Sequence, residues 1–142
     1  MQLFFTNGAI GSRIPDNAAW QQALQDDPVT RLLLDIVANP ALGESQEHIR
    51  PLPYIYRQPA RQGHFSLEDG MLYMKEIFQD DEKFVKLRIV PSSLYNIIFI
   101  AFHANPIGGH LNVYRTNHRI RQRYFWPGMY QYVKRMCKAC PG

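Results

Sequence analysis

The stretch HANPIGGH at residues 103–110, followed by CKAC at residues 137–140, decides how the C-terminal part of this chain folds. Two histidines flank a loop of proline and glycine, and after 26 intervening residues two cysteines are spaced Cys-x-x-Cys. Two imidazoles on a short loop and two thiolates one helical turn apart can offer four ligands to one tetrahedral zinc ion. The candidate metal ligands are His103, His110, Cys137 and Cys140.

The two pairs together carry more weight than either pair alone. A lone histidine is more often an ordinary polar residue than a ligand, and an isolated Cys-x-x-Cys also suits a redox site. A structural zinc ion supplies about 10–16 kcal/mol of binding energy, which becomes folding energy where the empty site is disordered. We therefore expect a metal to stabilise this part of the chain. The remaining histidines, which lack comparable partners, are His48, His64 and His118.

The segment between the pairs contains HLNVYRT at residues 110–116 and RIRQRYFWPGM at residues 119–129. With these motifs, the chain from about residue 64 to residue 142 resembles the His-His-Cys-Cys zinc module at the N-terminus of integrases from retroviruses and long-terminal-repeat retrotransposons. The resemblance implies zinc as cofactor, and DNA and other integrase subunits as partners. It departs from the family pattern at Asn112, where glycine is usual, and at Arg115, which replaces a lysine.

The family pattern leaves two interpretations of the cysteines. Counted from Trp126, the first metal-binding cysteine of the pattern falls at Cys140, and its mate falls one residue beyond Gly142. Cys137 would then be a packed core residue rather than a ligand. In the other interpretation Cys137 and Cys140 complete the site together with the two histidines. The apolar helical stripe that Cys137 would share consists of Met129, Val133 and Met136.

Acidic and basic residues are distributed very unevenly along the chain, although its net charge is only +4. All twelve Asp and Glu residues lie at or before Glu82, and residues 83–142 carry ten Lys and Arg residues without a single acid. Surfaces of mixed sign are the commoner way to stay soluble. A polyanionic partner such as DNA is therefore the simpler explanation for an acid-free stretch of this length.

A basic helix is predicted over residues 111–125, with Val113, Thr116, Ile120 and Tyr124 facing inward. Arg115, Arg119 and Arg123 follow one another at i+4, a spacing at which like charges repel by a few tenths of a kcal/mol. A phosphate backbone would relieve this repulsion, whereas the alternative is a solvated basic face. The predicted nucleic-acid-binding residues are Arg115, Arg119, Arg121, Arg123, Lys134, Arg135 and Lys138.

Upstream of this module, Asp16 or Asn17 is predicted to cap a first helix, and Asp27 with Pro28 to begin a second. Residues 40–63, with four prolines, are predicted to be a linker or an irregular wrap. Three antiparallel strands are expected at residues 65–67, 71–77 and 84–90, with an Asp-Gly turn between the first two. Pro91 and two serines should then cap a helix from Leu94 to Phe102.

The predicted fold class is therefore α+β. A small antiparallel β extension precedes a three-helix zinc-binding His-His-Cys-Cys module, and short helices precede both. The predicted divisions are residues 1–63 (helical and proline-rich), 64–91 (the β extension) and 92–142 (the zinc-binding domain, truncated in one interpretation of the cysteines). With 46% hydrophobic and 13% aromatic residues, the chain has enough apolar side chains for a core.

The expected function is that of a non-catalytic module of a retroelement integrase, contributing to DNA binding and multimerisation. By resemblance, the catalytic carboxylates belong to a core that follows the cysteines, so we expect no enzyme activity. The alternatives are a truncated or domesticated fragment acting only in protein interaction, or part of a DNA-joining enzyme whose core is missing. The longest apolar run, residues 97–102, is too short to cross a bilayer, and no export signal opens the chain. We expect an intracellular protein, nuclear or cytoplasmic, with no membrane or small-molecule substrate as partner.

Overall fold

The first two helices begin where the sequence predicts. The computed structural model describes residues 14–77, 84–103 and 110–139. Helix α1 (Asn17–Asp26) is capped by Asp16, whose carboxylate accepts a hydrogen bond of 2.9 Å from the Ala19 amide. Helix α2 (Pro28–Ala38) is capped in the same way by Asp27, at 3.0 Å from the Thr30 amide. Both caps satisfy amides that a first helical turn leaves without partners.

The prediction of a linker over residues 40–63 is wrong. This stretch folds into a 3₁₀ helix η2 (Pro40–Glu44) and two short α-helices, α3 (Gln46–Ile49) and α4 (Tyr54–Arg61). Pro40 and Pro53 lie at helix starts, where a missing amide costs nothing, so they begin helices instead of preventing them. Burial of Leu52 and Tyr56 against the rest of the chain then stabilises helices too short to form alone.

The antiparallel β extension is confirmed. Strands β1 (Phe65–Glu68), β2 (Met71–Ile77) and β3 (Phe84–Ile89) pair in sequence order. The turn between β1 and β2 places Asp69 at φ +51° and Gly70 at φ +79°. Two consecutive residues in the left-handed region give the hairpin turn that the Asp-Gly pair predicts.

A fourth strand was not predicted. Strand β4 (Tyr124–Phe125) pairs in parallel with β3, so the sheet order is β1-β2-β3-β4. The Arg88 amide donates to the Arg123 carbonyl at 2.8 Å, and the Val90 amide donates to the Phe125 carbonyl at 3.1 Å. The predicted helix over residues 111–125 therefore ends earlier, at Arg121, because its last residues complete the sheet.

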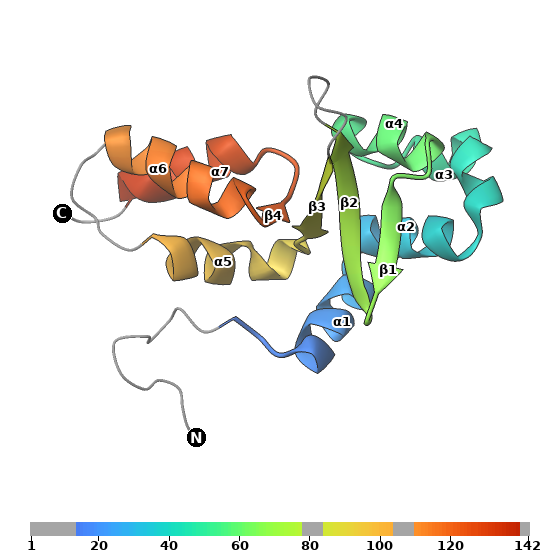
Figure 1. Cartoon of the computed structure of the whole chain (residues 1–142), viewed down its shortest axis with the longest axis horizontal. Coiled ribbons are helices and arrows are strands. Elements are labelled where there is room, and N and C mark those ends of the chain that lie inside the picture. The colour runs from blue at the N-terminus through green and yellow to red at the C-terminus, as the bar shows by residue number, and fades with distance from the viewer. Residues whose placement is uncertain (1–13, 78–83, 104–109, 140–142) are drawn as a thin grey trace.

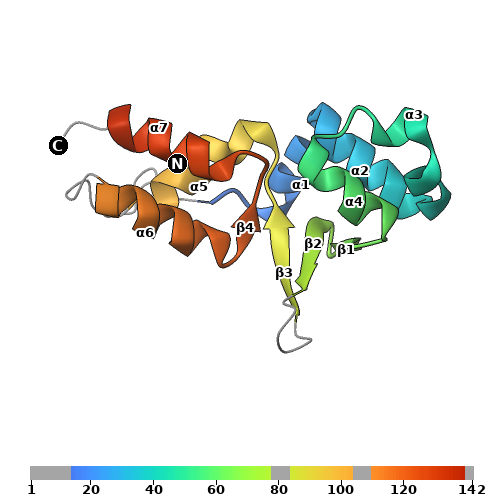
Figure 2. The same ribbon diagram turned by 90° about the horizontal axis from the view of Figure 1, so that it is seen from above.

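Three helices form the C-terminal end of the molecule. A 3₁₀ turn η3 (Ser92–Leu94) leads into α5 (Tyr95–Phe102), and α6 (His110–Arg121) and α7 (Met129–Ala139) follow. Figures 1 and 2 show these helices packed side by side at one end, with α2, α3 and α4 at the other end and the sheet and α1 between them. The predicted capping of α5 by its serines is wrong, because the Ser92 hydroxyl donates to Asp27 of the N-terminal helices instead.

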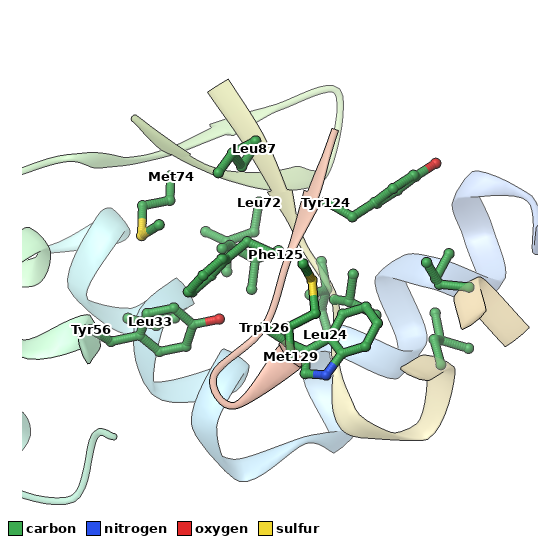
Figure 3. Packing of buried hydrophobic residues seen from close by; sticks show 14 of the residues in the cluster. Leu24, Leu33, Tyr56, Leu72, Met74, Leu87, Tyr124, Phe125, Trp126 and Met129 are labelled. Carbon is green, nitrogen blue, oxygen red and sulfur yellow. The ribbon is translucent and has the colours of Figure 1, made fainter. Parts of the chain in front are cut away.

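One apolar core runs through all of these parts. Trp20 of α1, Tyr56 of α4 and Trp126 after β4 are fully buried in it. Figure 3 shows Tyr56 and Trp126 within this core. Tyr124 stacks on Trp20 with ring centroids 5.9 Å apart, and Phe125 meets Tyr56 edge-on at the same distance. Strand β4 thus connects the N-terminal helices to the C-terminal ones. No helix in the described part of the chain has the length and apolar character to cross a membrane.

Candidate metal centre and basic surface

Two of the predicted metal ligands lie together. His103 ends α5, where its amide donates to the Phe99 carbonyl, and Cys137 lies on α7. The Nδ1 atom of His103 is 3.9 Å from the Sγ atom of Cys137, although 34 residues separate them in sequence. Nitrogen and sulfur ligands of one tetrahedral zinc ion lie about 3.5 Å apart, given the usual Zn–N and Zn–S bond lengths. The pair therefore fits adjacent corners of such a site.

The surroundings of His103 suit a metal ligand. Its ring stacks on Phe99, with centroids 4.7 Å apart and planes 19° from parallel. The side-chain nitrogen of Asn112 lies 3.4 Å from Nδ1. The Nε2 atom is buried and finds no hydrogen-bond partner among the residues that the structure describes. Burial lowers the pKa of His103, which favours the neutral imidazole that metal ligation requires.

The other two predicted ligands are not placed. Helix α6 begins at His110, but the described part of the structure does not include the His110 side chain or Cys140. Among the described residues, no group of three or more His, Cys, Asp or Glu side chains is positioned to hold a metal ion. The complete ligand set therefore stays a prediction.

The stripe on α7 that bears Cys137 faces the core. Met129 and Val133 are buried, and Met136 and Cys137 are half-buried and packed against the same cluster. This packing agrees with the interpretation of Cys137 as a core residue, whereas its distance to His103 agrees with the interpretation as a ligand. Both interpretations of the cysteines stay open on these observations.

The inward face of α6 is as predicted. Val113, Thr116 and Ile120 are buried, and Tyr124 beyond the helix is buried as well. Trp126 is also buried, stacked on Tyr95 at 4.6 Å. These contacts fix the rotation of α6 about its axis and so determine which of its side chains face the solvent.

Most of the predicted nucleic-acid-binding residues are exposed. Arg115, Arg119 and Arg123 face solvent along α6 and just beyond it. On α7, Arg135 and Lys138 are exposed and Lys134 is half-buried, with the Arg135 guanidinium 5.3 Å from the centre of the Tyr132 ring. The two ion pairs found among the described residues, Lys86–Glu68 and Arg121–Glu76, involve none of these six side chains.

Arg121 differs from the other six predicted nucleic-acid-binding residues because it forms an ion pair. Its guanidinium donates to both carboxylate oxygens of Glu76 on β2, at 3.1 and 2.6 Å, and lies 4.9 Å from the centre of the Phe125 ring. Arg121 thus joins α6 to the sheet, and its charge already has a partner. Sequence reasoning missed this contact because Glu76 lies 45 residues away and no local pattern connects the two.

His103 and Cys137 lie together on a group of three packed helices, an arrangement typical of a small helical module. Residues 90–142 match the family model described as the integrase zinc binding domain. The resemblance to this family, inferred above from the motifs, is therefore confirmed for this segment, and zinc binding and DNA integration are the properties of that family. No solved structure matches the chain.

Proposed function

We propose that this chain is a zinc-stabilised module of a retroelement integrase that holds DNA and contacts other integrase subunits. The observation that carries the proposal is the approach of His103 to Cys137, at 3.9 Å, within the segment that matches the family. Such a role belongs inside the cell, in the nucleus or cytoplasm. The module binds and positions its partners, and we assign it no step of DNA joining.

The proposed zinc ligands are His103, His110, Cys137 and Cys140. Bound there, the metal would hold together α5, α6 and the end of α7. The chain itself contributes a neutral imidazole, fixed by stacking on Phe99 and approached by the Asn112 amide. The Asn112 nitrogen lies 3.4 Å from the same Nδ1 atom that faces Cys137, so it would move aside if a metal bound that atom.

Measuring zinc in purified variants tests this ligand set. Cys140→Ser should lose zinc in either interpretation of the cysteines, whereas Cys137→Ser should lose zinc only if Cys137 is a ligand. Cys137→Ala tests the packing role separately, because alanine keeps an apolar side chain at that position. If the chain with all four residues intact binds less than one zinc per molecule, the metal proposal fails.

The proposed DNA surface consists of the exposed and half-buried cations on α6, α7 and the segment between them. Six side chains compose it: Arg115, Arg119, Arg123, Lys134, Arg135 and Lys138. Each contacted phosphate releases counterions, so the association constant for DNA should fall as the salt concentration rises. A plot of the logarithm of this constant against the logarithm of salt concentration should have a slope of about −3 to −4 if about four phosphates are neutralised. Arg121, predicted from sequence as part of this surface, has its charge paired with Glu76 and should contribute less.

Titration of zinc-loaded protein with duplex DNA at several salt concentrations tests the surface. Arg119→Ala should reduce the magnitude of the slope by about one unit. Arg31→Ala, an exposed arginine of α2 at the other end of the molecule, is the matched control and should leave the slope unchanged. Affinity that is independent of salt, or no binding at all, would contradict the DNA proposal.

A second candidate function is protein interaction alone. Tyr114 on α6 is 71% exposed and Tyr130 on α7 is 43% exposed, and aromatic side chains of this kind are enriched at interfaces. A dimer that depends on zinc but has no DNA affinity would favour this function. A strand-joining assay of the same protein should be blank, and joining that depends on magnesium would replace both candidates with an enzyme.

A further inference from the structure

A cavity at the opposite end of α5 from His103 has chemistry that neither zinc nor DNA binding uses. It measures about 320 Å³ and lies where α2 and α4 meet the segment leading into α5. Its polar lining includes Asp27, Tyr56, Ser92 and Tyr95, and its apolar walls include Val29 and Val90. The cavity thus combines one acidic end with walls of proline and valine.

The Asp27 carboxylate is held in its charged form. Its Oδ1 atom accepts from the Ser92 hydroxyl at 2.6 Å and from the Ser92 amide at 3.2 Å, and Oδ2 accepts from the Thr30 amide at 3.0 Å. Burial alone would raise the pKa of Asp27, but these hydrogen bonds outweigh it and lower the pKa below 3.8. Neither ion pair of the described residues includes Asp27, so its charge has hydrogen bonds but no cation in that part of the chain.

The second observation is the hydroxyl of Tyr56. This side chain is completely buried, and its hydroxyl finds no hydrogen-bond partner within the described part of the chain. Burial keeps the phenol protonated, since it raises the pKa of Tyr56 well above 10.0 and the pKa of Tyr95 to about 12. A buried hydroxyl without a partner is unfavourable, so a group that hydrogen-bonds to it would be retained in the cavity.

We propose that this cavity binds a cation on an aliphatic stem, an alkylammonium or alkylguanidinium group. The cation would lie against the Asp27 carboxylate and donate to the Tyr56 hydroxyl, while the stem would pack on the valine and proline walls. An anion is excluded by the charge of Asp27. The site goes beyond the proposed function, because neither zinc nor DNA takes part in it. Two sources share this chemistry: a free small amine, and a lysine or arginine side chain of a second copy.

The test is an NMR titration of the full, zinc-loaded chain with n-butylammonium, following the backbone amides of Asp27, Thr30 and Ser92. We expect saturable shifts at these amides. The neutral isostere n-butanol should bind at least tenfold more weakly. Asp27→Asn should lower the affinity for n-butylammonium at least tenfold. It should preserve the α2 cap, because asparagine caps helices as well as aspartate does. Asp26→Asn changes an exposed carboxylate one residue away and should have no effect.

Tyr56→Phe gives an independent reading. This variant should lower the affinity for n-butylammonium several-fold, because the cation loses a hydrogen-bond acceptor. The proposal is overturned if n-butanol binds as well as n-butylammonium, or if Asp27→Asn leaves the affinity unchanged. The cavity would then be an apolar, hydrated space. Sedimentation with and without excess n-butylammonium separates the two sources. If the chain self-associates and the amine abolishes this association, the ligand is a side chain of a second copy. If the chain is a monomer in both conditions, the ligand is a free amine.

Discussion

Single residues connect the two ends of this molecule. Asp27 is both the cap of α2 and the acceptor for Ser92, which lies 65 residues further along the chain. Arg88 lies over the Trp20 ring at 4.1 Å and also contacts Asn17 and Met71, so β3 is fastened to α1. Arg121 and Glu76 join α6 to the sheet. Apart from the α2 cap, each of these contacts joins residues that are distant in sequence, so no local pattern predicts it.

Asp27 should make stability depend on pH. Its pKa is lower in the folded chain than its usual 3.8, so the folded state binds fewer protons than the unfolded state as the solution becomes acidic. Its contribution is therefore complete above pH 3.8 and is lost as the pH falls through the folded pKa. Denaturation of wild type and Asp27→Asn as a function of pH should show free energies of unfolding that converge below pH 3.8. If the difference in free energy of unfolding between the two proteins did not change with pH, the charge of Asp27 would not contribute to stability.

Glu76→Gln should release Arg121. The two side chains are about one-third exposed, so the loss of stability should be below about 1 kcal/mol. DNA affinity at low salt should rise, because an acid is removed and a guanidinium becomes available to phosphate. Glu68→Gln is the matched control, since it breaks the Lys86 pair elsewhere on the sheet. Urea denaturation and DNA titration of the two variants measure both effects, and equal changes in DNA affinity would contradict the expectation.

At the scale of elements, β4 has an influence beyond its two residues. It ends α6, adds a parallel strand to an antiparallel sheet, and places Tyr124, Phe125 and Trp126 in the core (Figure 3). Gly128 follows at φ +74°, which lets the chain reverse into α7. The direction of α7, and hence the position of Cys137, depends on this turn.

Phe125→Ala should therefore destabilise the whole chain, by about 3–5 kcal/mol, as removal of a buried phenylalanine usually does. Tyr130→Ala removes an aromatic ring from the exposed side of α7 and should cost less than about 0.5 kcal/mol. The measurement is the free energy of unfolding in urea. Equal losses in the two variants would mean that β4 is not a part of the core.

The whole molecule is polarised in charge. Residues 14–77 contain nine Asp and Glu residues and five Lys and Arg residues, whereas residues 84–139 contain nine Lys and Arg residues and no acid. The formal charge of the described residues is therefore negative over residues 14–77 and positive over residues 84–139. If DNA is the partner, as proposed, it would approach the end that carries α6 and α7, because that end has no acidic residue among the described ones.

Metal removal tests whether the chain unfolds as one unit. Because one apolar cluster includes residues of α1, α4, the sheet and α7, a chelator should lower the midpoint of a single thermal transition. Calorimetry with and without chelator measures this. Two separate transitions, with only one affected, would instead favour the three-part division into residues 1–63, 64–91 and 92–142, which stays a prediction.

The sequence by itself determined the features that depend on neighbours a few residues apart. The Asp27 cap, the Asp-Gly hairpin, the buried face of α6 and the histidine and cysteine pairs are of this kind, because side-chain periodicity and turn chemistry act locally. Only the tertiary structure decided that residues 40–63 form helices, that Tyr124 and Phe125 form a strand, and that Arg121 pairs with Glu76. The tertiary structure alone likewise shows that His103 lies close to Cys137 and that a cavity lies beside Asp27. Each depends on surfaces brought together across dozens of residues, where burial overrides what proline content or helical periodicity would favour locally.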